Sequence, residues 1–430
     1  MKMAVSIAAI SLFISFIINV PIAIGLAAST LLYFIISNQL PIMIVAQRMI
    51  GAVESVPLLA IPFFVTLGTL MNYSGLSKKV MDFAEVLTGH MIGGLAQVNV
   101  LLSTLMGGLS ASNLADAAMQ SKILVPEMVR FGYSKEFSAA VTAASSLITP
   151  IIPPGIGLIV YGFIANVSIG KMFMAGIIPG ILMCVAQMMA VHVVSKKRGY
   201  RPTREKRASL REVFVAFKDA AWALTLVIVI IGGVRAGICT PTEAGAIAVF
   251  YTVIIGVFVY RDLKAKDIYK AIVEAVQSTG SIMLIIMAAS AFAWVLTWEG
   301  VTHNITNLVV GITPNPYVFL LVINIFLLIL GMLVEGSSAM IILIPLLLPT
   351  VKALGIDLIH FGIILILNLA IGTLTPPMGT ILFVTSSLTG AKMELIVKEL
   401  VPFYIVLLIS LFLVTYVPAI SLFLPSFLFR

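Results

Sequence analysis

Two short stretches decide the fold of this chain: residues 145–155 read SSLITPIIPPG, and residues 368–380 read NLAIGTLTPPMGT. They hold the two Pro-Pro dipeptides of the sequence, at 153–154 and 376–377, each inside a long run of uncharged residues. Proline has no backbone N–H and clashes with the preceding turn, so an α-helix cannot continue through either dipeptide. Each stretch therefore predicts a helix that is broken in the middle of an apolar region.

The composition places these broken helices in a membrane. Apolar residues make up 60% of the 430 residues, and Asp, Glu, Lys and Arg together make up only 10%. Because soluble domains carry about 25% charged residues, the chain is predicted to be an all-α polytopic integral membrane protein, not a soluble, disordered or disulfide-stapled one. Non-helical backbone at membrane depth has to be buried in protein or line a cavity.

The sequence also contains an internal repeat. The second Pro-Pro dipeptide lies 223 positions after the first, and other glycines and prolines recur at similar spacing. These further pairs are Gly108 and Gly331, Pro126 and Pro349, and Gly132 and Gly355, with Gly75 and Gly300 and also Asn99 and Asn324 at a spacing of 225. Apolar helices resemble one another by composition alone, but glycines and prolines that recur at a constant spacing favour a duplication over coincidence.

The charge distribution orients the two repeats. Nine of the 26 Lys and Arg residues fall within 196–218, and a second basic stretch runs over 261–270. We interpret this bias as a topology signal and not as a nucleic-acid patch, and it predicts that both stretches are cytoplasmic. Two crossings between them return the chain to the same side. An odd number of crossings per repeat then gives inverted repeats, related by a pseudo-two-fold axis in the membrane plane, with Arg430 in the periplasm.

These signals divide the chain into five parts. They are an N-terminal region of one long or two hinged membrane helices (1–50); repeat one (51–195), with a re-entrant hairpin tip at 107–116 and a broken helix at 137–165; a basic cytoplasmic loop (196–218); a linking helical hairpin (219–260); and repeat two (261–430), with a tip at 331–338, a broken helix at 359–385 and a C-terminal membrane helix. Inverted repeats with re-entrant hairpins and broken helices are typical of secondary transporters, whose sites lie near the midplane. In the linking hairpin, residues 240–243 (TPTE) predict a helix capping box.

The four interrupted segments are rich in neutral oxygen donors, and Asp116 and Glu335 are their only carboxylates. Asp116 follows Asn113 by three residues, which permits an N-cap, whereas Glu335 shows no capping pattern. Hydroxyl, amide and unwound carbonyl oxygens suit a hard monovalent cation, and half-helix N-termini favour an anion. Since neutral oxygens do not titrate, sodium is favoured over a proton as the coupling ion. Small and hydroxyl residues also let membrane helices pack closely, which explains any single one of them equally well.

Three stretches resemble the large membrane subunit of the tripartite ATP-independent periplasmic transporters. They are 110–162 (SASNLADAAMQSKILVPEMVRFGYSKEFSAAVTAASSLITPIIPPGIGLIVYG), 241–251 (PTEAGAIAVFY) and 355–384 (GIDLIHFGIILILNLAIGTLTPPMGTILFV). The resemblance covers essentially the whole chain and implies a multi-pass symporter of the bacterial inner membrane. Sodium would drive uptake of an organic anion, such as sialic acid or a C4-dicarboxylate, by an elevator mechanism. The implied partners are a small membrane subunit of about four helices and a periplasmic binding protein that delivers the substrate.

Carried over onto this sequence, the resemblance implies a cation site at each tip with its break, and the substrate between the two tips. The candidate sodium-binding residues are Ser110, Ser112, Asn113, Ser145, Thr149, Pro150, Gly331, Ser337, Ser338, Gly372, Thr373, Thr375 and Met378. The candidate substrate-binding residues are Ser112, Asn113, Asp116, Pro154, Glu335, Gly336, Asn368, Pro377 and Gly379. Asn113 stands where the family motif has a small apolar residue, so it adds a ligand or only a helix cap.

Other classes of protein fit the sequence less well. A proton-coupled or binding-protein-independent anion transporter of a related fold is the alternative, and titratable carboxylates in the broken segments would be expected of it. An enzyme acting on lipid-linked substrates would need a convergent nucleophile, base or metal cluster. The four histidines show no ligand spacing, so the chain is predicted to be neither an enzyme nor a transition-metal protein. A channel has no need of two occluding tips.

Overall fold

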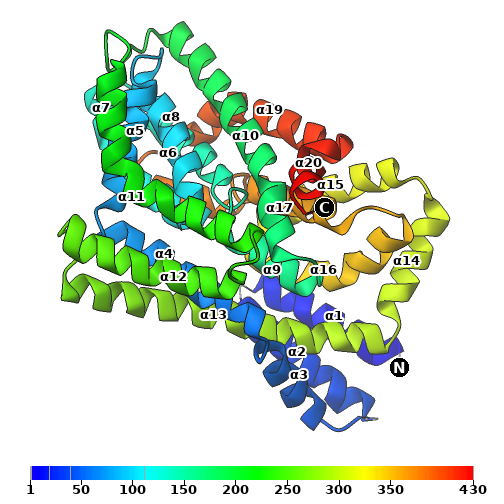
Figure 1. The fold of residues 1–430 in the computed structure, drawn as a ribbon. Helices are drawn as coiled ribbons and strands as arrows, with labels where there is room; N and C mark the ends of the chain where they lie inside the picture. Colours follow the sequence, from blue (N-terminus) through cyan, green and yellow to red (C-terminus); the bar gives the residue numbers. More distant parts are fainter. Residues whose placement is uncertain (1, 19, 39, 111, 430) are drawn as a thin grey trace.

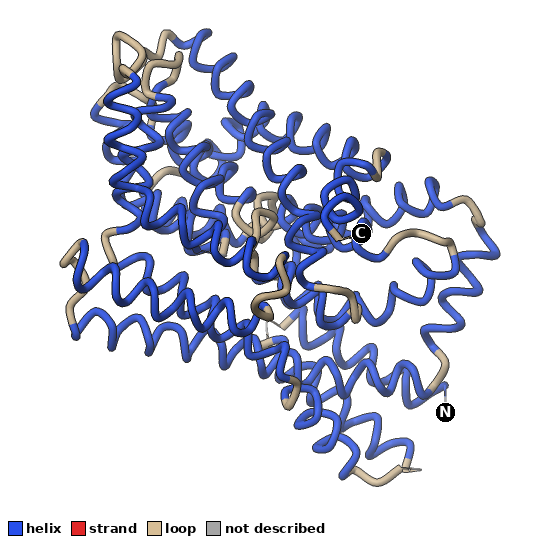
Figure 2. Tube along the Cα trace, viewed as in Figure 1, coloured by secondary structure: helices blue, strands red, loops and turns tan. Residues whose placement is uncertain are grey.

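The computed structural model of this chain describes residues 2–18, 20–38, 40–110 and 112–429. Over these residues the chain forms helices and no strand (Figure 1; Figure 2). Eight helices in the described part are long and apolar enough to cross a membrane. The longest, α13, has 34 residues, which is ~51 Å and well beyond the ~30 Å of a hydrocarbon core. The prediction of an all-α polytopic membrane protein is confirmed.

The described residues form twenty α-helices and three short helical segments of other types. The N-terminal region forms α1 (Lys2–Ile17), α2 (Ile22–Ser37) and α3 (Met43–Val53). Repeat one contains η1 (Val56–Leu59), α4 (Ala60–Tyr73), α5 (Leu76–Thr88), α6 (Gly94–Ser110), α7 (Asn113–Arg130), α8 (Lys135–Ser145), η2 (Ser146–Ile148), α9 (Ile156–Ile164) and α10 (Ile169–Arg198). The linking hairpin is α11 (Leu210–Arg235) and α12 (Pro241–Ile254), extended by η3 (Ile255–Val259). Repeat two contains α13 (Ala265–Trp298), α14 (Val301–Ile312), α15 (Pro316–Leu333), α16 (Gly336–Ala353), α17 (Leu358–Gly372), α18 (Thr380–Thr389), α19 (Met393–Tyr416) and α20 (Ala419–Leu428).

The glycines matched between the halves adopt matched backbone conformations. Gly75 and Gly300 precede α5 and α14 with φ of +75° and +70°, and Gly132 and Gly355 follow α7 and α16 with φ of +89° and +68°. A residue with a Cβ adopts such left-handed angles only at a cost. The shared glycines therefore reflect a shared backbone, in which α6 and α7 correspond to α15 and α16, and α8 with α9 corresponds to α17 with α18.

Both broken helices are interrupted in the interior. The first stops with η2 at Ile148 and resumes with α9, and the second stops with α17 at Gly372 and resumes with α18. Figure 2 shows loop segments in the middle of the molecule, surrounded by helices. In the second break, the Met378 N–H donates to the Met332 carbonyl (3.2 Å), which ties the loop to the end of α15. Hydrogen bonds of this kind replace those that the helix has lost.

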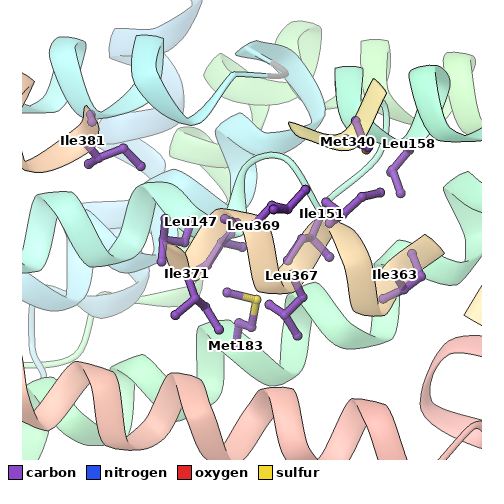
Figure 3. Packing of buried hydrophobic residues seen from close by; sticks show 14 of the residues in the cluster. Leu147, Ile151, Leu158, Met183, Met340, Ile363, Leu367, Leu369, Ile371 and Ile381 are labelled. Carbon is purple, nitrogen blue, oxygen red and sulfur yellow. The ribbon is translucent and has the colours of Figure 1, made fainter. Parts of the chain in front are cut away.

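The helices form two groups around the breaks. α4 contacts both α12 and α13 (Figure 1), and α13 also contacts α2 and α3. The second group holds both hairpins, both broken helices, α10 and α19. At its centre, side chains of α17 pack with those of the first break and with Met183 of α10 (Figure 3). Because lipid tails are as apolar as these side chains, close packing, and not exclusion of water, stabilises this core.

Two predicted boundaries need correction. The basic loop predicted over 196–218 comprises only residues 199–209, because α10 continues to Arg198 and a capping box between Ser209 and Glu212 starts α11. The boundary predicted at residue 50 falls within α3, which continues to Val53; before it lie two apolar helices, α1 and α2, with Pro21 directly ahead of α2, as the two-helix alternative predicted. The predicted capping box of α12 is confirmed, since the Glu243 N–H donates to Thr240 Oγ1 (3.3 Å) and the Thr240 N–H to Glu243 Oε2 (2.8 Å). Arg430 lies outside the described residues.

Candidate functional site

A cavity of about 350 Å³ lies where the two groups of helices meet. Both hairpin tips, the first break and α17 line one part of it, and α4 and α13 line the other. Its polar lining residues are Thr69, Ser112, Asn113, Ser278, Ser281, Glu335, Ser337 and Thr373. No lysine or arginine of the described chain is among the lining residues, so Glu335 supplies the only charged side chain there.

At the first tip, side chains cap the start of α7. The backbone of Ser112 is extended (φ −131°, ψ 122°), and its Oγ accepts from the Ala115 N–H (3.4 Å). Asn113 Oδ1 accepts from the Leu114 N–H (2.9 Å). The N-cap is therefore Ser112, and the Asn113 amide oxygen has a local role in the first turn of α7. Ala111 and the Ser110 side chain, which includes one predicted ligand atom, lie outside the described residues.

Asp116, for which an N-cap role was possible, instead points into the protein and is 1% exposed. Its Oδ2 accepts from Ser103 Oγ (2.7 Å) and Thr149 Oγ1 (3.2 Å), and Gln120 Nε2 donates to both carboxylate oxygens (2.8 Å each). A buried carboxylate is tolerated only when its oxygens are hydrogen-bonded in this way. The network joins α6 and α7 of the first hairpin to the first break.

The network continues from Ser103 to the end of α8. Ser103 and Ser145 lie 3.0 Å apart at their hydroxyls, and Ser145 Oγ donates to Asn99 Oδ1 (2.8 Å). Sequence reasoning missed Ser103 and Gln120 as members of the site. A usable signal existed, because Asn99 and Ser103 are one helical turn apart in an apolar helix, as are Asp116 and Gln120.

At the second tip, the prediction that Glu335 shows no capping role is wrong. Its carboxylate accepts from the N–H groups of Ser337 (3.0 Å) and Ser338 (2.9 Å) and from Ser338 Oγ (2.9 Å). α16 begins at Gly336, so the carboxylate lies directly over the free N–H groups of the first turn, where negative charge is stabilised. The α16 N-terminus is thus already occupied by an anionic group of the chain itself.

The second break holds its hydroxyls differently. Thr373 Oγ1 donates to the Ala370 carbonyl (2.7 Å) and Thr375 Oγ1 to the Ile371 carbonyl (3.0 Å). Each hydroxyl thus donates its proton to a carbonyl of α17, and its oxygen lone pairs remain available. Gly372 lies against Gly331 so closely that a Cβ added to it would come within 2.5 Å of the Gly331 Cα. α15 and α17 therefore touch backbone to backbone at this point.

The structure brings together some of the predicted site residues and not others. Those that line the cavity are Ser112, Asn113, Pro150, Glu335, Gly336, Ser337 and Thr373. Those that lie outside its lining are Asp116, Ser145, Thr149, Pro154, Gly331, Ser338, Asn368, Gly372, Thr375, Pro377, Met378 and Gly379. Sequence reasoning missed Thr69, Ser278 and Ser281, which belong to α4 and α13. Both helices run without a break, so they do not count among the interrupted segments; in α13 the polar stretch at 277–281 (QSTGS) was a usable signal.

One helix end at the cavity has no side-chain cap. Ile156 and Gly157, the first residues of α9, line the cavity, and Gly155 before them makes no capping hydrogen bond through a side chain. The first N–H groups of a helix have no partner within it and attract negative charge. The cavity thus combines one open helix N-terminus at the first break with one self-capped N-terminus at the second tip.

Two inverted repeats that bring re-entrant tips and broken helices around one cavity define a multi-pass membrane transporter. A family model described as "Tripartite ATP-independent periplasmic transporter, DctM component" matches residues 9–420. The chain belongs to this family of transporter permeases, as the resemblance predicted. Its relatives include proteins named for different substrates, and each covers most of this chain.

The isethionate TRAP transporter permease protein DctMQ of Oleidesulfovibrio alaskensis is 40% identical over 95% of this chain, and the chain spans 64% of the length of that relative. The sialic acid TRAP transporter large permease protein SiaM of Vibrio cholerae is 38% identical, over 95% of both chains. The C4-dicarboxylate TRAP transporter large permease protein DctM of Pseudomonas aeruginosa is 39% identical, over 89% of both. The crystal structure of the Alcanivorax borkumensis YdaH transporter shares the fold alone, with a TM-score of 0.53 and 14% identity over 89% of this chain and 88% of that one.

Proposed function

We propose that this chain is the large membrane subunit of a bacterial inner-membrane symporter that imports an organic anion together with sodium. The observation that carries the proposal is the cavity shared by the two tips, α4 and α13. Its volume, about 350 Å³, lies in the range of small-molecule sites. Isethionate, sialic acid and C4-dicarboxylates, for which relatives are named, are all small organic anions, which supports an anionic substrate here.

The charges around the cavity suggest how the anion is oriented. Its acidic group would lie at the open N-terminus of α9, near Ile156 and Gly157, where unpaired N–H groups face the cavity. It would avoid the α16 N-terminus, because the Glu335 carboxylate already accepts from the Ser337 and Ser338 N–H groups there. The remaining hydroxyls of the lining then serve the polar groups of the substrate.

Sodium would bind once in each repeat. In the first, the oxygens of Ser112, Asn113, Ser145 and Thr149 are neutral donors at or near the tip and the break. In the second, the Thr373 and Thr375 hydroxyls keep their lone pairs, and the Gly331 carbonyl lies close to Gly372 of the same break. Two sodium ions with one monovalent anion carry net positive charge inward, so an inside-negative potential should accelerate uptake.

The elevator mechanism would move the hairpins and broken helices against α4, α12 and α13. The cavity supports this part of the proposal because each of the two groups of helices contributes one wall. The proposed partners are a small membrane subunit, which would enlarge the fixed group, and a periplasmic binding protein, which would deliver the anion. The basic loop at 199–209 would face the cytoplasm.

A proton-coupled carrier is the second candidate, and one observation favours it. Asp116 is a titratable group that is 1% exposed and forms no ion pair within the described residues. A carboxylate in such a place is a common proton carrier.

The test uses proteoliposomes that contain the chain, its small subunit and the binding protein. Uptake of sialic acid, succinate and isethionate is measured in parallel. We expect uptake of one of them to require an inward sodium gradient and, where that anion is monovalent, to increase with an inside-negative potential. Equal uptake on a proton gradient in sodium-free buffer would overturn sodium coupling and favour the second candidate.

A further inference from the structure

Two asparagines, one in the first arm of each hairpin, make a similar contact with the broken helix of their own half. Asn99 in α6 and Asn324 in α15 are 225 positions apart, and their partners Ser145 in α8 and Asn368 in α17 are 223 positions apart. Asn99 Oδ1 accepts from Ser145 Oγ (2.8 Å), and Asn324 Oδ1 accepts from Asn368 Nδ2 (2.7 Å). The donor side chains differ, yet both halves keep the amide acceptor and its distance.

The amide nitrogens are also used. Asn99 Nδ2 donates to Thr142 Oγ1 (2.7 Å), and Asn324 Nδ2 donates to Thr415 Oγ1 (3.0 Å). Asn99 is fully buried and Asn324 is 7% exposed. A leucine would fill the same space without needing hydrogen-bond partners, so packing alone does not explain an amide at these positions. A buried polar pair instead fixes which residue of one helix lies opposite which residue of the next.

The positions that these pairs align are the proposed sodium sites. Asn368 lies one helical turn before Gly372, and Asn324 two turns before Gly331, so their hydrogen bond sets the register in which the two glycines meet. In the first half, the chain of contacts runs from Asn99 through Ser145 and Ser103 to the Asp116 carboxylate, which also holds Thr149.

We propose that Asn99 and Asn324 are positioning residues, each of which fixes the first arm of a hairpin to the broken helix of its own repeat and thereby holds one sodium site in its binding geometry. They do not line the cavity, and the candidate site residues that they contact are Ser145 and Asn368. The inference rests on the proposed function, because it assigns them a role in sodium binding. It predicts that their loss weakens sodium binding more than it weakens the fold.

The test measures sodium binding by the purified full-length chain in nanodiscs, with sodium itself as the probe. The melting temperature is followed as NaCl replaces choline chloride at constant ionic strength, which yields both the sodium-free stability and the dissociation constant for sodium. Asn99→Leu and Asn324→Leu should each raise that constant at least tenfold. Gln97→Leu is the matched control, since Gln97 lies on the same helix, is fully buried and donates to the Met188 carbonyl (3.0 Å), away from the site.

Two milder variants keep the test decisive if the leucine variants do not fold. Thr142→Val and Thr415→Val keep the shape of the side chain and remove the oxygen that each asparagine amide donates to. They should raise the sodium dissociation constant three- to fivefold. Asn99→Leu combined with Ser145→Ala should raise it by less than the product of the two single effects, because both changes break one contact.

The outcomes separate the inference from the proposed function. If sodium does not stabilise the wild-type chain more than choline does, sodium coupling fails and the inference fails with it. If sodium stabilises the wild type, but Asn99→Leu and Thr142→Val change the dissociation constant no more than Gln97→Leu does, the asparagines are structural only. The inference is then overturned while the proposed function stands.

Discussion

The two hairpin tips share a backbone plan and differ in where each places its carboxylate. In the first half, Asp116 turns inward and holds Ser103, Gln120 and Thr149 in a network without exposure to the cavity. In the second half, Glu335 lines the cavity and caps α16. Both halves thus keep the helix breaks and an asparagine contact. The carboxylate of each tip has a different role, as the centre of a buried network in the first half and as a helix cap in the second.

The breaks differ in the same way. Position 149 of the first half corresponds to position 372 of the second, where Thr149 donates to Asp116 and Gly372 instead meets the backbone of Gly331. One break is joined to its hairpin by side-chain hydrogen bonds, and the other by direct contact of two helices. Equivalent positions of the two repeats can therefore both join a break to its hairpin, one through hydrogen bonds and the other through backbone packing.

The largest expected effect tests whether the two halves are inverted in the membrane. Each labelled position is reached either from the outside or not at all. In a chain with Cys184→Ala and Cys239→Ala, a cysteine at position 204 in the basic loop and one at 315 in the α14–α15 link should label from opposite sides of the membrane. A membrane-impermeant maleimide applied to intact spheroplasts should reach position 315 and not position 204. Labelling of position 204 from outside would refute the inverted arrangement.

The next largest effect is expected when Gly372 of the second break is replaced by threonine, the residue at the equivalent position 149 of the first break. Gly372→Thr places side-chain atoms against the Gly331 backbone, which has no rotamer to relieve the overlap. We expect a loss of ~3 kcal/mol or more in stability, seen as loss of the monodisperse peak in size-exclusion chromatography. Gly311→Ala is the control, because no heavy atom lies within 4 Å of the added Cβ, and it should behave as wild type. Wild-type behaviour of Gly372→Thr would mean that the close contact is not needed.

The two carboxylates should differ when each is removed. Asp116→Ala removes the buried acceptor that Ser103, Gln120 and Thr149 share, at a cost of ~3 kcal/mol. Glu335→Ala removes a helix cap that faces the cavity, at a cost of ~1 kcal/mol. Thermal unfolding of the purified variants checks the order, and sodium-driven uptake should fall at least tenfold for Asp116→Ala. Equal destabilisation by both changes would contradict the different tasks assigned to the two tips.

The smallest effect is expected on the affinity for the anion. Glu335→Gln keeps a side-chain acceptor near the start of α16 and removes the only charge among the described lining residues. The half-saturating concentration of the anion should fall by about fivefold, equivalent to ~1 kcal/mol of relieved repulsion. Glu394→Gln, at an exposed carboxylate in the first turn of α19, is the control and should leave that concentration unchanged. An increase with Glu335→Gln would mean that the carboxylate attracts the substrate.

The sequence by itself determined the features that depend on a few neighbouring residues. Proline pairs stop a helix wherever they occur, so both breaks could be located. The recurring glycines at 75 and 300 marked the internal repeat, and the TPTE run marked the start of α12, because a capping preference acts within one turn of the chain. Composition alone required a membrane, and the basic stretches predicted its orientation.

Only the tertiary structure decided which side chains meet. Ser103 and Thr149 lie 13 and 33 residues from Asp116, and Thr69 and Ser278 reach the cavity from uninterrupted helices of the other group. Even the role of Glu335 depended on where α16 begins, because a carboxylate is a cap only if the first free N–H groups lie beneath it. Such contacts depend on the register and packing of whole helices, which no short pattern of residues specifies.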